Sequence, residues 1–347
     1  MRDLFTPVDP LRETYSRIYA ALTELREGFH RSGRLDDSNA KLDEVSKLFA
    51  TYLAHKNGAI PRFPAADSPS LVGELQAAFA ATVKLQQYQM DGVGSIFGSQ
   101  PALAIRAGDE SLATDLVRLV RDSVDLAFNL RAAGRPFDIL NEAFGHFVRD
   151  NFRSNIEDAQ FMTPPEVVDF MADVVLHDIA KEDPAVSDRN KHWIVVDPTC
   201  GVGSFLTAVY HRAQSSDWLR PTHLRLFGQD KVERMVRLST INLLLFDAEE
   251  HRVTVGNSLE RGSPTDRLNG LADIILTNPP FGARFDPGYV AGRCGDNVPF
   301  FSGLRRSPAT IDSELLFVDR NLRLLRDGGR LLIVVPDGVI SAKGVQA

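Results

Sequence analysis

The segment from Val195 to Leu206 limits the fold of this chain more than any other stretch. It reads Val-Val-Asp-Pro-Thr-Cys-Gly-Val-Gly-Ser-Phe-Leu, which predicts a buried strand, a glycine turn and a helix. Gly201 and Gly203 permit a tight turn with no side chain in the way of a ligand, and Ser204 is predicted to cap the helix. The start of such a helix offers free backbone N–H groups and a positive dipole end. The segment therefore predicts a ligand site at the end of a strand.

Strand and helix patterns alternate through the rest of the second half of the chain. Apolar runs predict five strands, at residues 193–196, 224–227, 253–255, 272–277 and 330–335. Helical patterns separate them, and alternation of this kind implies right-handed crossovers and a mostly parallel sheet. The predicted fold class of this half is therefore α/β, with ligands at the carboxyl ends of the strands.

The first half of the chain has a different pattern and is predicted to be helical throughout. Apolar residues recur at helical spacing in five stretches, residues 11–25, 42–52, 71–97, 112–130 and 138–152. Apolar stripes of this kind usually form a core rather than a binding site. The sequence thus predicts an all-helical N-terminal domain over residues 1–155, followed by the α/β domain over residues 156–347.

A second motif, Asn278-Pro279-Pro280-Phe281, follows the fourth predicted strand. The two prolines bias Asn278 and Pro279 away from helical geometry, so the chain leaves the sheet extended and stiff. The Asn278 side-chain oxygen and the Pro279 carbonyl can then both accept hydrogen bonds from one amino group. Alone, the tetrapeptide would be interpreted as an Asn-Pro turn. Combined with Asp197 directly before the glycine turn, it indicates a site.

Together, the two motifs resemble the signature of S-adenosylmethionine-dependent DNA methyltransferases that act on the 6-amino group of adenine. In that family the first motif is usually Asp-Pro-x-Cys-Gly-x-Gly and the second Asn-Pro-Pro-Phe or Asn-Pro-Pro-Tyr. The resemblance implies a Rossmann-like methyltransferase core, S-adenosyl-L-methionine as cofactor, and double-stranded DNA whose target adenine is flipped out of the helix. It also implies that the catalytic residues are Asn278, Pro279, Pro280 and Phe281, with Phe281 stacking on the base.

The resemblance further implies which residues bind the cofactor. In the family a Phe/Tyr-Thr-Pro segment covers the methionine half of the cofactor, and an acidic residue after the second strand accepts hydrogen bonds from the ribose hydroxyls. A Gly-Asp-Ser/Thr-Leu segment contacts the amino group of the cofactor's own adenine. Asn257 stands where the family frequently has aspartate, so that contact lacks charge assistance. The predicted cofactor-binding residues are Gln160, Phe161, Met162, Thr163, Pro164, Asp197, Thr199, Cys200, Gly201, Gly203, Ser204, Asp230, Asn257 and Ser258.

Several of these residues also have a purely structural interpretation. Thr163, Pro164 and Glu166 form the pattern of a capping box with proline in the first helical position. Asp230 can cap the helix predicted to follow it. Cys200 is predicted to pack within the turn rather than act as a nucleophile, because no activating histidine is near it in the sequence.

The segment of residues 282–313 is long and rich in glycine, proline and arginine. Either it is a loop that orders on DNA with its arginines on phosphates, or it is a solvated, partly disordered connection. In the family, a strand hairpin after the fifth strand completes the sheet. Here the chain ends at residue 347, so the core is predicted to be truncated after its fifth strand.

The front domain resembles the modification subunit of type I restriction–modification systems. The resemblance lies in residues 138–147 and in Phe161-Met162-Thr163-Pro164. It implies a DNA-specificity subunit and a restriction subunit as partners. No target-recognition segment is visible in the sequence, so the choice of target is assigned to the specificity subunit. The net charge of −7 agrees with this, since a stand-alone nucleic-acid binder needs cations for the phosphates.

Composition excludes other classes of protein. The two cysteines, Cys200 and Cys294, cannot make a disulfide framework or a four-ligand zinc site, and no metal is predicted. No run approaches the roughly 18 apolar residues of a membrane span. The first residues lack the pattern of a signal peptide. A cytoplasmic location with no membrane partner is therefore predicted.

Two other functions remain open at this point. A protein-glutamine methyltransferase can share the core, although Phe281 and the long helical front domain weigh against it. A non-catalytic scaffold that binds the cofactor or DNA complexes is the other, and the short C-terminus favours it. Detection of N6-methyladenine in treated DNA would exclude the scaffold, whereas label found only in protein would favour the glutamine enzyme.

Overall fold

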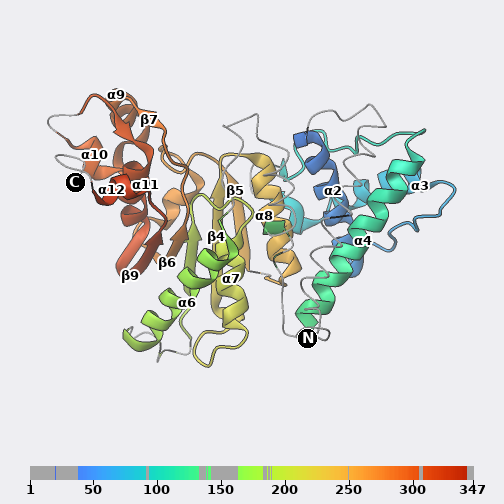
Figure 1. Ribbon diagram of the computed structural model, residues 1–347, viewed down its shortest axis with the longest axis horizontal. Coiled ribbons are helices and arrows are strands. Elements are labelled where there is room, and N and C mark those ends of the chain that lie inside the picture. Colours follow the sequence, from blue (N-terminus) through green and yellow to red (C-terminus); the bar gives the residue numbers. More distant parts are fainter. Residues whose placement is uncertain are drawn as a thin grey trace, which may run out of the picture. The chain divides into compact units, whose positions relative to one another are not determined.

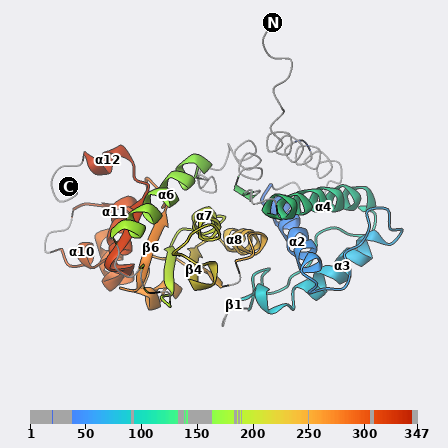
Figure 2. The same cartoon turned by 90° about the horizontal axis from the view of Figure 1, so that it is seen from below.

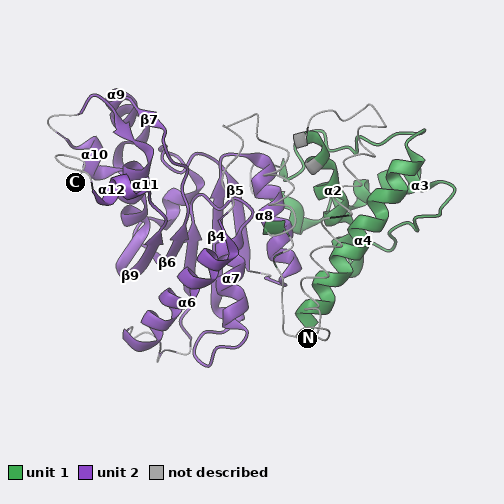
Figure 3. Cartoon of the chain, viewed as in Figure 1, with its two compact units in different colours: residues 1–159 green, residues 160–347 purple. Residues whose placement is uncertain are grey.

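The computed structural model describes residues 38–90, 94–132, 163–182, 190–248, 250–304 and 308–341, with the single residues 20, 138, 140, 141, 186 and 188. The chain divides into two compact units, residues 1–159 and residues 160–347 (Figure 3). Each unit has its own buried core, and each is described below by itself.

Unit 1 is built on three helices, α2 (Ser38–Lys56), α3 (Leu71–Thr82) and α4 (Glu110–Ala132). The helix predicted over 71–97 ends at Thr82, because a 3₁₀ turn and a short antiparallel ladder follow it. The ladder pairs β1 (Gln89–Met90) with β2 (Gly94–Ser95), where Gly94 has a φ of +101° that glycine favours. Nearly all of the stretches 11–25 and 138–152 lies outside the described residues.

Unit 2 contains a five-stranded parallel sheet in the order β5-β4-β3-β6-β9 (Figure 1). Its first strand in the chain is central, so the strand order reverses beside it, between β3 and β6. The strands are β3 (Trp193–Asp197), β4 (Leu224–Asp230), β5 (His251–Val255), β6 (Ala272–Thr277) and β9 (Leu325–Ile333). The predicted parallel α/β sheet is confirmed.

Helices cover both faces of this sheet (Figures 1 and 2). On one face α6 (Pro165–Glu182), α7 (Ser204–Ala213) and α8 (Glu233–Leu245) lie side by side. On the other face lie α11 (Ser313–Leu324) and the 3₁₀ helix η4 (Pro264–Leu268). The buried cluster on that second face consists of Val196, Leu268, Ala272, Ile275 and Leu324. Burial on both faces explains why neighbouring residues of a strand are both apolar in the middle of β3, at Val195 and Val196, and in the middle of β6, at residues 274–276.

The last strand differs from its predicted extent. It begins at Leu325, which pairs with Ala272, and the pairing then resumes at Arg330 opposite Ile274. The register shifts between these two points, where Gly328 adopts a φ of +72°. Gly328 and Gly329, which precede the predicted strand, therefore lie at an irregularity within the strand itself.

The segment of residues 282–313 is folded over its described part, residues 282–304 and 308–313. Strand β7 (Arg284–Phe285) pairs antiparallel with β8 (Ile311–Asp312). Between them lie α9 (Pro287–Tyr289), a π-helical turn (Val290–Cys294) and α10 (Pro299–Ser302). The buried side chains of Val290, Cys294, Val298 and Phe301 belong to one apolar cluster with residues of α11. The described part of this segment is therefore neither a disordered connection nor a loop that must order on DNA, because its apolar residues recur every three or four positions and anchor it to the core. Contact of its arginines with DNA phosphates stays a prediction.

Candidate active site

Four parallel strands bring the predicted site residues to one edge of the sheet in unit 2. Strands β5, β4, β3 and β6 are consecutive neighbours, and their carboxyl ends are Val255, Asp230, Asp197 and Thr277. Asn278 follows the end of β6 directly, and Asn257 is the second residue after the end of β5. This edge includes the point where the strand order reverses, which is the usual ligand position in open α/β sheets.

The glycine turn is held against the end of β4. The Gly201 N–H donates to Asp230 Oδ2 at 3.1 Å, and the Cys200 N–H donates to the Gln229 carbonyl at 2.9 Å. Gly203 has a φ of +83° and occupies the N-cap position of α7. Ser204, predicted as the cap, is instead the first helical residue, and its buried hydroxyl has no hydrogen-bond partner among the described residues.

Gly203 is the position in the turn where a side chain is least tolerated. A Cβ there would lie far inside van der Waals contact with the Ser239 hydroxyl, whereas a Cβ at Gly201 would meet nothing within 4 Å. Both glycines have positive φ. We expect Gly203→Ala to lower the free energy of unfolding by about 2 kcal/mol, because alanine is strained in the left-handed conformation and its methyl group would overpack against Ser239. Gly201→Ala is the matched control, and in urea unfolding it should lose less free energy of unfolding than Gly203→Ala does. Equal losses in the two variants would contradict the packing explanation.

Asp197 lies in the interior between β3 and β6, with 1% of its surface exposed. Its Oδ1 accepts from the Thr277 hydroxyl at 2.8 Å and from the Thr199 N–H at 3.1 Å. The Thr199 and Thr277 hydroxyls are 2.7 Å apart. Burial raises the pKa of Asp197 to about 7. Asp197 therefore links β3 to β6, the two strands that lead into the two sequence motifs.

Asp230 ends β4 with a buried carboxylate that is bonded to backbone on both sides. Its Oδ1 accepts from the Val232 N–H at 2.9 Å, and its Oδ2 accepts from Gly201. Burial raises its pKa above the ordinary aspartate value. Helix α8 begins at Glu233 with Val232 in the N-cap position, so Asp230 is not the helix cap. Each carboxylate oxygen has more than one lone pair, so Asp230 can also accept from a ligand.

Asn257 is hydrogen-bonded to the carboxylate of Glu260, which was not predicted as a site residue. Its Nδ2 donates to Glu260 Oε1 at 3.2 Å, and its Oδ1 accepts from the Leu259 N–H at 3.2 Å. Glu260 is bonded in turn to the Tyr289 hydroxyl at 2.5 Å and to Arg293 at 3.0 Å. The folded segment after β6 therefore holds the loop after β5, and no local pattern in the sequence indicates this link.

Cys200 and Ser258 are buried packing residues of the site. Burial raises the pKa of the Cys200 thiol, and the carboxylates of Asp230 and Asp197 add to the effect. A thiol that stays protonated is a poor nucleophile, in agreement with the predicted packing role. The Ser258 hydroxyl donates to the Pro198 carbonyl and joins the loop after β5 to the glycine turn.

Asn278 presents the most exceptional polar group of the site. Its Nδ2 donates to Thr163 Oγ1 at 3.1 Å. Its Oδ1 is buried and has no hydrogen-bond partner among the described residues. Buried acceptors are nearly always bonded. An acceptor left open at the end of β6 is therefore suited to a donor that a ligand brings.

The rest of the second motif is supported by the start of α11. The Pro280 carbonyl accepts from the Ser313 hydroxyl at 3.1 Å, and the Gly282 N–H donates to Glu314 Oε1 at 3.4 Å. The Phe281 side chain is 40% exposed. Ser313 and Glu314 were missed as site residues, because they follow the motif only after the whole folded segment.

The segment before α6 is described from Thr163 onward. Gln160, Phe161 and Met162, predicted to bind the cofactor, lie outside the described residues. The helix begins at Pro165, so Pro165 rather than Pro164 is the first helical residue. The Pro164 carbonyl accepts from the N–H groups of the first turn. The predicted cap is therefore shifted by one residue.

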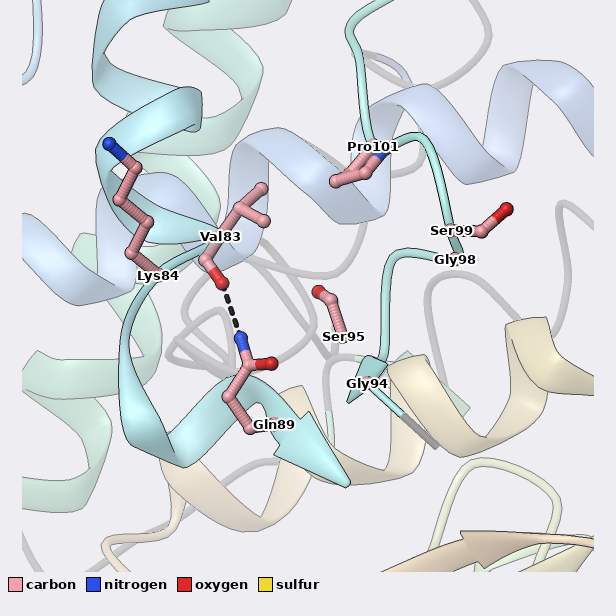
Figure 4. Close-up of a pocket in the computed structure, with 8 residues that line it drawn as sticks. All are labelled: Val83, Lys84, Gln89, Gly94, Ser95, Gly98, Ser99 and Pro101. Atoms are coloured by element: carbon pink, nitrogen blue, oxygen red, sulfur yellow. Dashed lines mark hydrogen bonds between the residues drawn. The ribbon is translucent and has the colours of Figure 1, made fainter. Parts of the chain in front are cut away.

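Unit 1 contains a pocket of about 510 Å³ (Figure 4). Its lining residues are Val83, Lys84, Gln89, Gly94, Ser95, Gly98, Ser99 and Pro101. The Gln89 amide is bonded to the Val83 carbonyl, as the dashed line in Figure 4 shows. No lining residue is acidic, a histidine or a cysteine, so the Lys84 amine and the Ser95 and Ser99 hydroxyls have no such group beside them in the lining to activate them.

Within the described residues, none of the helices is both long and apolar enough to cross a membrane. The same part of the chain contains no cluster of three or more His, Cys, Asp or Glu side chains placed to hold a metal ion.

Residues 135–347 match the family model described as N-6 DNA Methylase. The chain is 26% identical over 323 residues to the type II methyltransferase M.MamI of Microbacterium ammoniaphilum, covering 85% of each chain. A type I restriction–modification methyltransferase subunit from Streptococcus thermophilus has a similar fold, with a TM-score of 0.57, 16% identity and coverage of 96% of this chain and 77% of that one. A Listeria monocytogenes protein described as a class I S-adenosylmethionine-dependent methyltransferase has the same TM-score, 14% identity and coverage of 95% and 76%.

The two structural likenesses establish the fold, and they confirm the predicted Rossmann-like methyltransferase core with a helical region before it. The family model covers most of the chain and includes both sequence motifs. The chain therefore belongs to the N-6 DNA Methylase family and is an adenine-specific DNA methyltransferase.

Proposed function

We propose that this chain transfers the methyl group of S-adenosyl-L-methionine to the 6-amino group of an adenine flipped out of double-stranded DNA, at a site chosen by a partner subunit. The observation that carries the proposal is the open Asn278 Oδ1 at the end of β6. An exocyclic amino group is a hydrogen-bond donor, and this oxygen is a buried acceptor without a donor among the described residues.

The residues along the strand ends fit the proposed cofactor. Gly201 and Gly203 bring no side chain to the turn, and the Ser204 hydroxyl at the start of α7 is buried with no partner among the described residues. Asp230 would take the ribose hydroxyls, and the loop at Asn257 and Ser258 would border the adenine. When bound, the cofactor supplies a methyl group on a positively charged sulfur, which is already a good leaving group.

The second motif would hold the target base. Asn278 Oδ1 and the Pro279 carbonyl would accept from the two N–H bonds of the amino group, drawing the nitrogen lone pair out of conjugation with the ring. Phe281, with its exposed ring, would stack on the flipped base. Rate would come from positioning and from acceptors fixed before the reaction, since no covalent intermediate is needed.

The partner assignment rests on the resemblance to type I modification subunits. The similar fold of the Streptococcus thermophilus subunit supports it. We propose a DNA-specificity subunit as the partner that selects the target sequence, and a restriction subunit as a further component. The match to the N-6 DNA Methylase family supports DNA, rather than a protein glutamine, as the methyl acceptor.

Calorimetric titration of the chain with S-adenosylmethionine tests the cofactor site. We expect saturable binding, and we expect Asp230→Ala to weaken it by about 1.5–3 kcal/mol, the range for a hydrogen bond to a charged group. That is roughly a 10- to 150-fold rise in Kd. Asp337→Ala, an exposed carboxylate on α12 (Asp337–Ile340), is the control and should bind as wild type does. Unchanged binding by the Asp230 variant would refute the ribose role.

A further inference from the structure

Thr163 stands apart from the other residues predicted to bind the cofactor, because its bond to Asn278 points to a different role. Its hydroxyl oxygen accepts from Asn278 Nδ2 at 3.1 Å, across a sequence separation of 115 residues. The nitrogen and the oxygen of the Asn278 amide therefore differ in their hydrogen bonding. The nitrogen is bonded to Thr163, whereas the oxygen is buried and has no partner in the part of the chain that the structure describes.

Both residues are held by rigid elements. Thr163 comes directly before the first turn of α6, where the Pro164 carbonyl accepts from the Val167 and Val168 N–H groups at 3.0 and 3.1 Å. Buried side chains on α6, among them Val168 and Met171, anchor that helix to the core. Asn278 follows Thr277, whose hydroxyl is bonded to Asp197 in the interior. A hydrogen bond between two fixed points restrains the amide against rotation.

Rotation of the Asn278 amide would be costly for the reaction. Only the carbonyl end of an amide accepts a hydrogen bond. An amide turned by half a rotation would present an NH₂ group to the amino group of the base, and the buried donors of that NH₂ group would lack partners. A hydroxyl both donates and accepts, so Thr163 can bond either end of the amide. The cost of the open donors therefore selects the observed orientation, and the Thr163 bond holds the amide in its plane. We propose that Thr163 is a positioning residue: its hydroxyl fixes the plane of the Asn278 carboxamide so that Oδ1 faces the target amino group. This inference rests on the proposed function and refines it.

The test compares two variants of Thr163 in methyl transfer under single-turnover conditions. Thr163→Val keeps the shape of the side chain and removes the hydroxyl, while Thr163→Ser keeps the hydroxyl. The substrate is duplex DNA carrying adenine opposite an abasic site, which lowers the cost of flipping. We expect the Val variant to lose ten- to a hundredfold in rate, the effect of a small misplacement. Its Kd for S-adenosylmethionine should stay within twofold of wild type, and the Ser variant should stay within threefold of the wild-type rate.

A second readout needs neither cofactor nor DNA. In chain labelled with ¹⁵N-asparagine, the side-chain amide signals that vanish in Asn278→Ala belong to Asn278. Thr163→Val should shift these signals and speed their exchange with solvent, and Thr163→Ser should leave them near their wild-type positions.

Three outcomes would overturn the positioning role. They are a wild-type rate in the Val variant, a loss that appears as weaker cofactor binding, and amide signals that do not respond to the Val substitution. Failure of the proposed function is distinguishable, because it would appear as wild-type chain that binds no cofactor or methylates no adenine. The amide signals would still decide whether Thr163 holds Asn278.

Discussion

Asn278→Ala is expected to reduce methyl transfer at least about 10³-fold, or about 4 kcal/mol in the barrier. The substitution removes Asn278 Oδ1, a buried acceptor that has no partner among the described residues. Removal of a single preorganised polar group from other enzymes costs about 10²–10³-fold. The loss here should exceed that range, because the target amino group loses its Asn278 acceptor and its position together. Single-turnover transfer of a labelled methyl group to DNA measures it.

Cofactor binding is the control for this variant. Asn278 follows β6, whereas the groups proposed to hold the cofactor follow β3, β4 and β5. We therefore expect the Kd for S-adenosylmethionine to change less than threefold. A variant that loses binding and transfer together would contradict this division of roles.

Asp197→Asn is expected to flatten the dependence of stability on pH. The pKa of Asp197 is raised from its ordinary value of 3.8 to about 7 by burial, so the folded chain holds a proton that the unfolded chain releases. The free energy of unfolding should then fall as pH rises from about 4 to about 7, by up to about 1.4 kcal/mol per pH unit. Asparagine cannot ionise and still offers an oxygen to Thr199 and Thr277.

Urea unfolding at half-unit steps from pH 4.5 to 8 measures this effect. Wild-type chain should lose about 2–4 kcal/mol over the range, and Asp197→Asn should lose clearly less. A smaller slope should remain in the variant, because the pKa of Asp230 is raised in the same direction. Asp337→Asn, exposed on α12, should follow wild type. Parallel profiles for wild type and Asp197→Asn would contradict the raised pKa.

The sheet and its motifs could be predicted because they depend on local patterns. A continuous apolar run before Asp197 and another before Asn278 indicate strands buried on both faces. The spacing of strands and helices then determines which residues reach the same edge. The glycine turn could be predicted equally well. The N-cap was predicted at Ser204 but lies at Gly203, because a left-handed glycine can occupy that position without a side-chain hydrogen bond.

The contacts that complete the site could not be predicted, because they join residues far apart in the chain. Thr163 reaches Asn278, and Glu260 ties Asn257 to Tyr289. No local pattern distinguishes Glu260 from a solvated surface carboxylate. The segment after β6 was misjudged for a related reason: its turns are short, so its apolar spacing is hidden among glycines and prolines.

The most direct test of the account is methyl transfer to DNA by the purified chain. The chain is incubated with methyl-labelled S-adenosylmethionine and duplex DNA that carries adenine opposite an abasic site, with Asn278→Ala in parallel. We expect label on the 6-amino group of adenine from wild-type chain and at least about 10³-fold less from the variant. Label on protein glutamine alone, no transfer to adenine, or equal transfer by the two chains would contradict it.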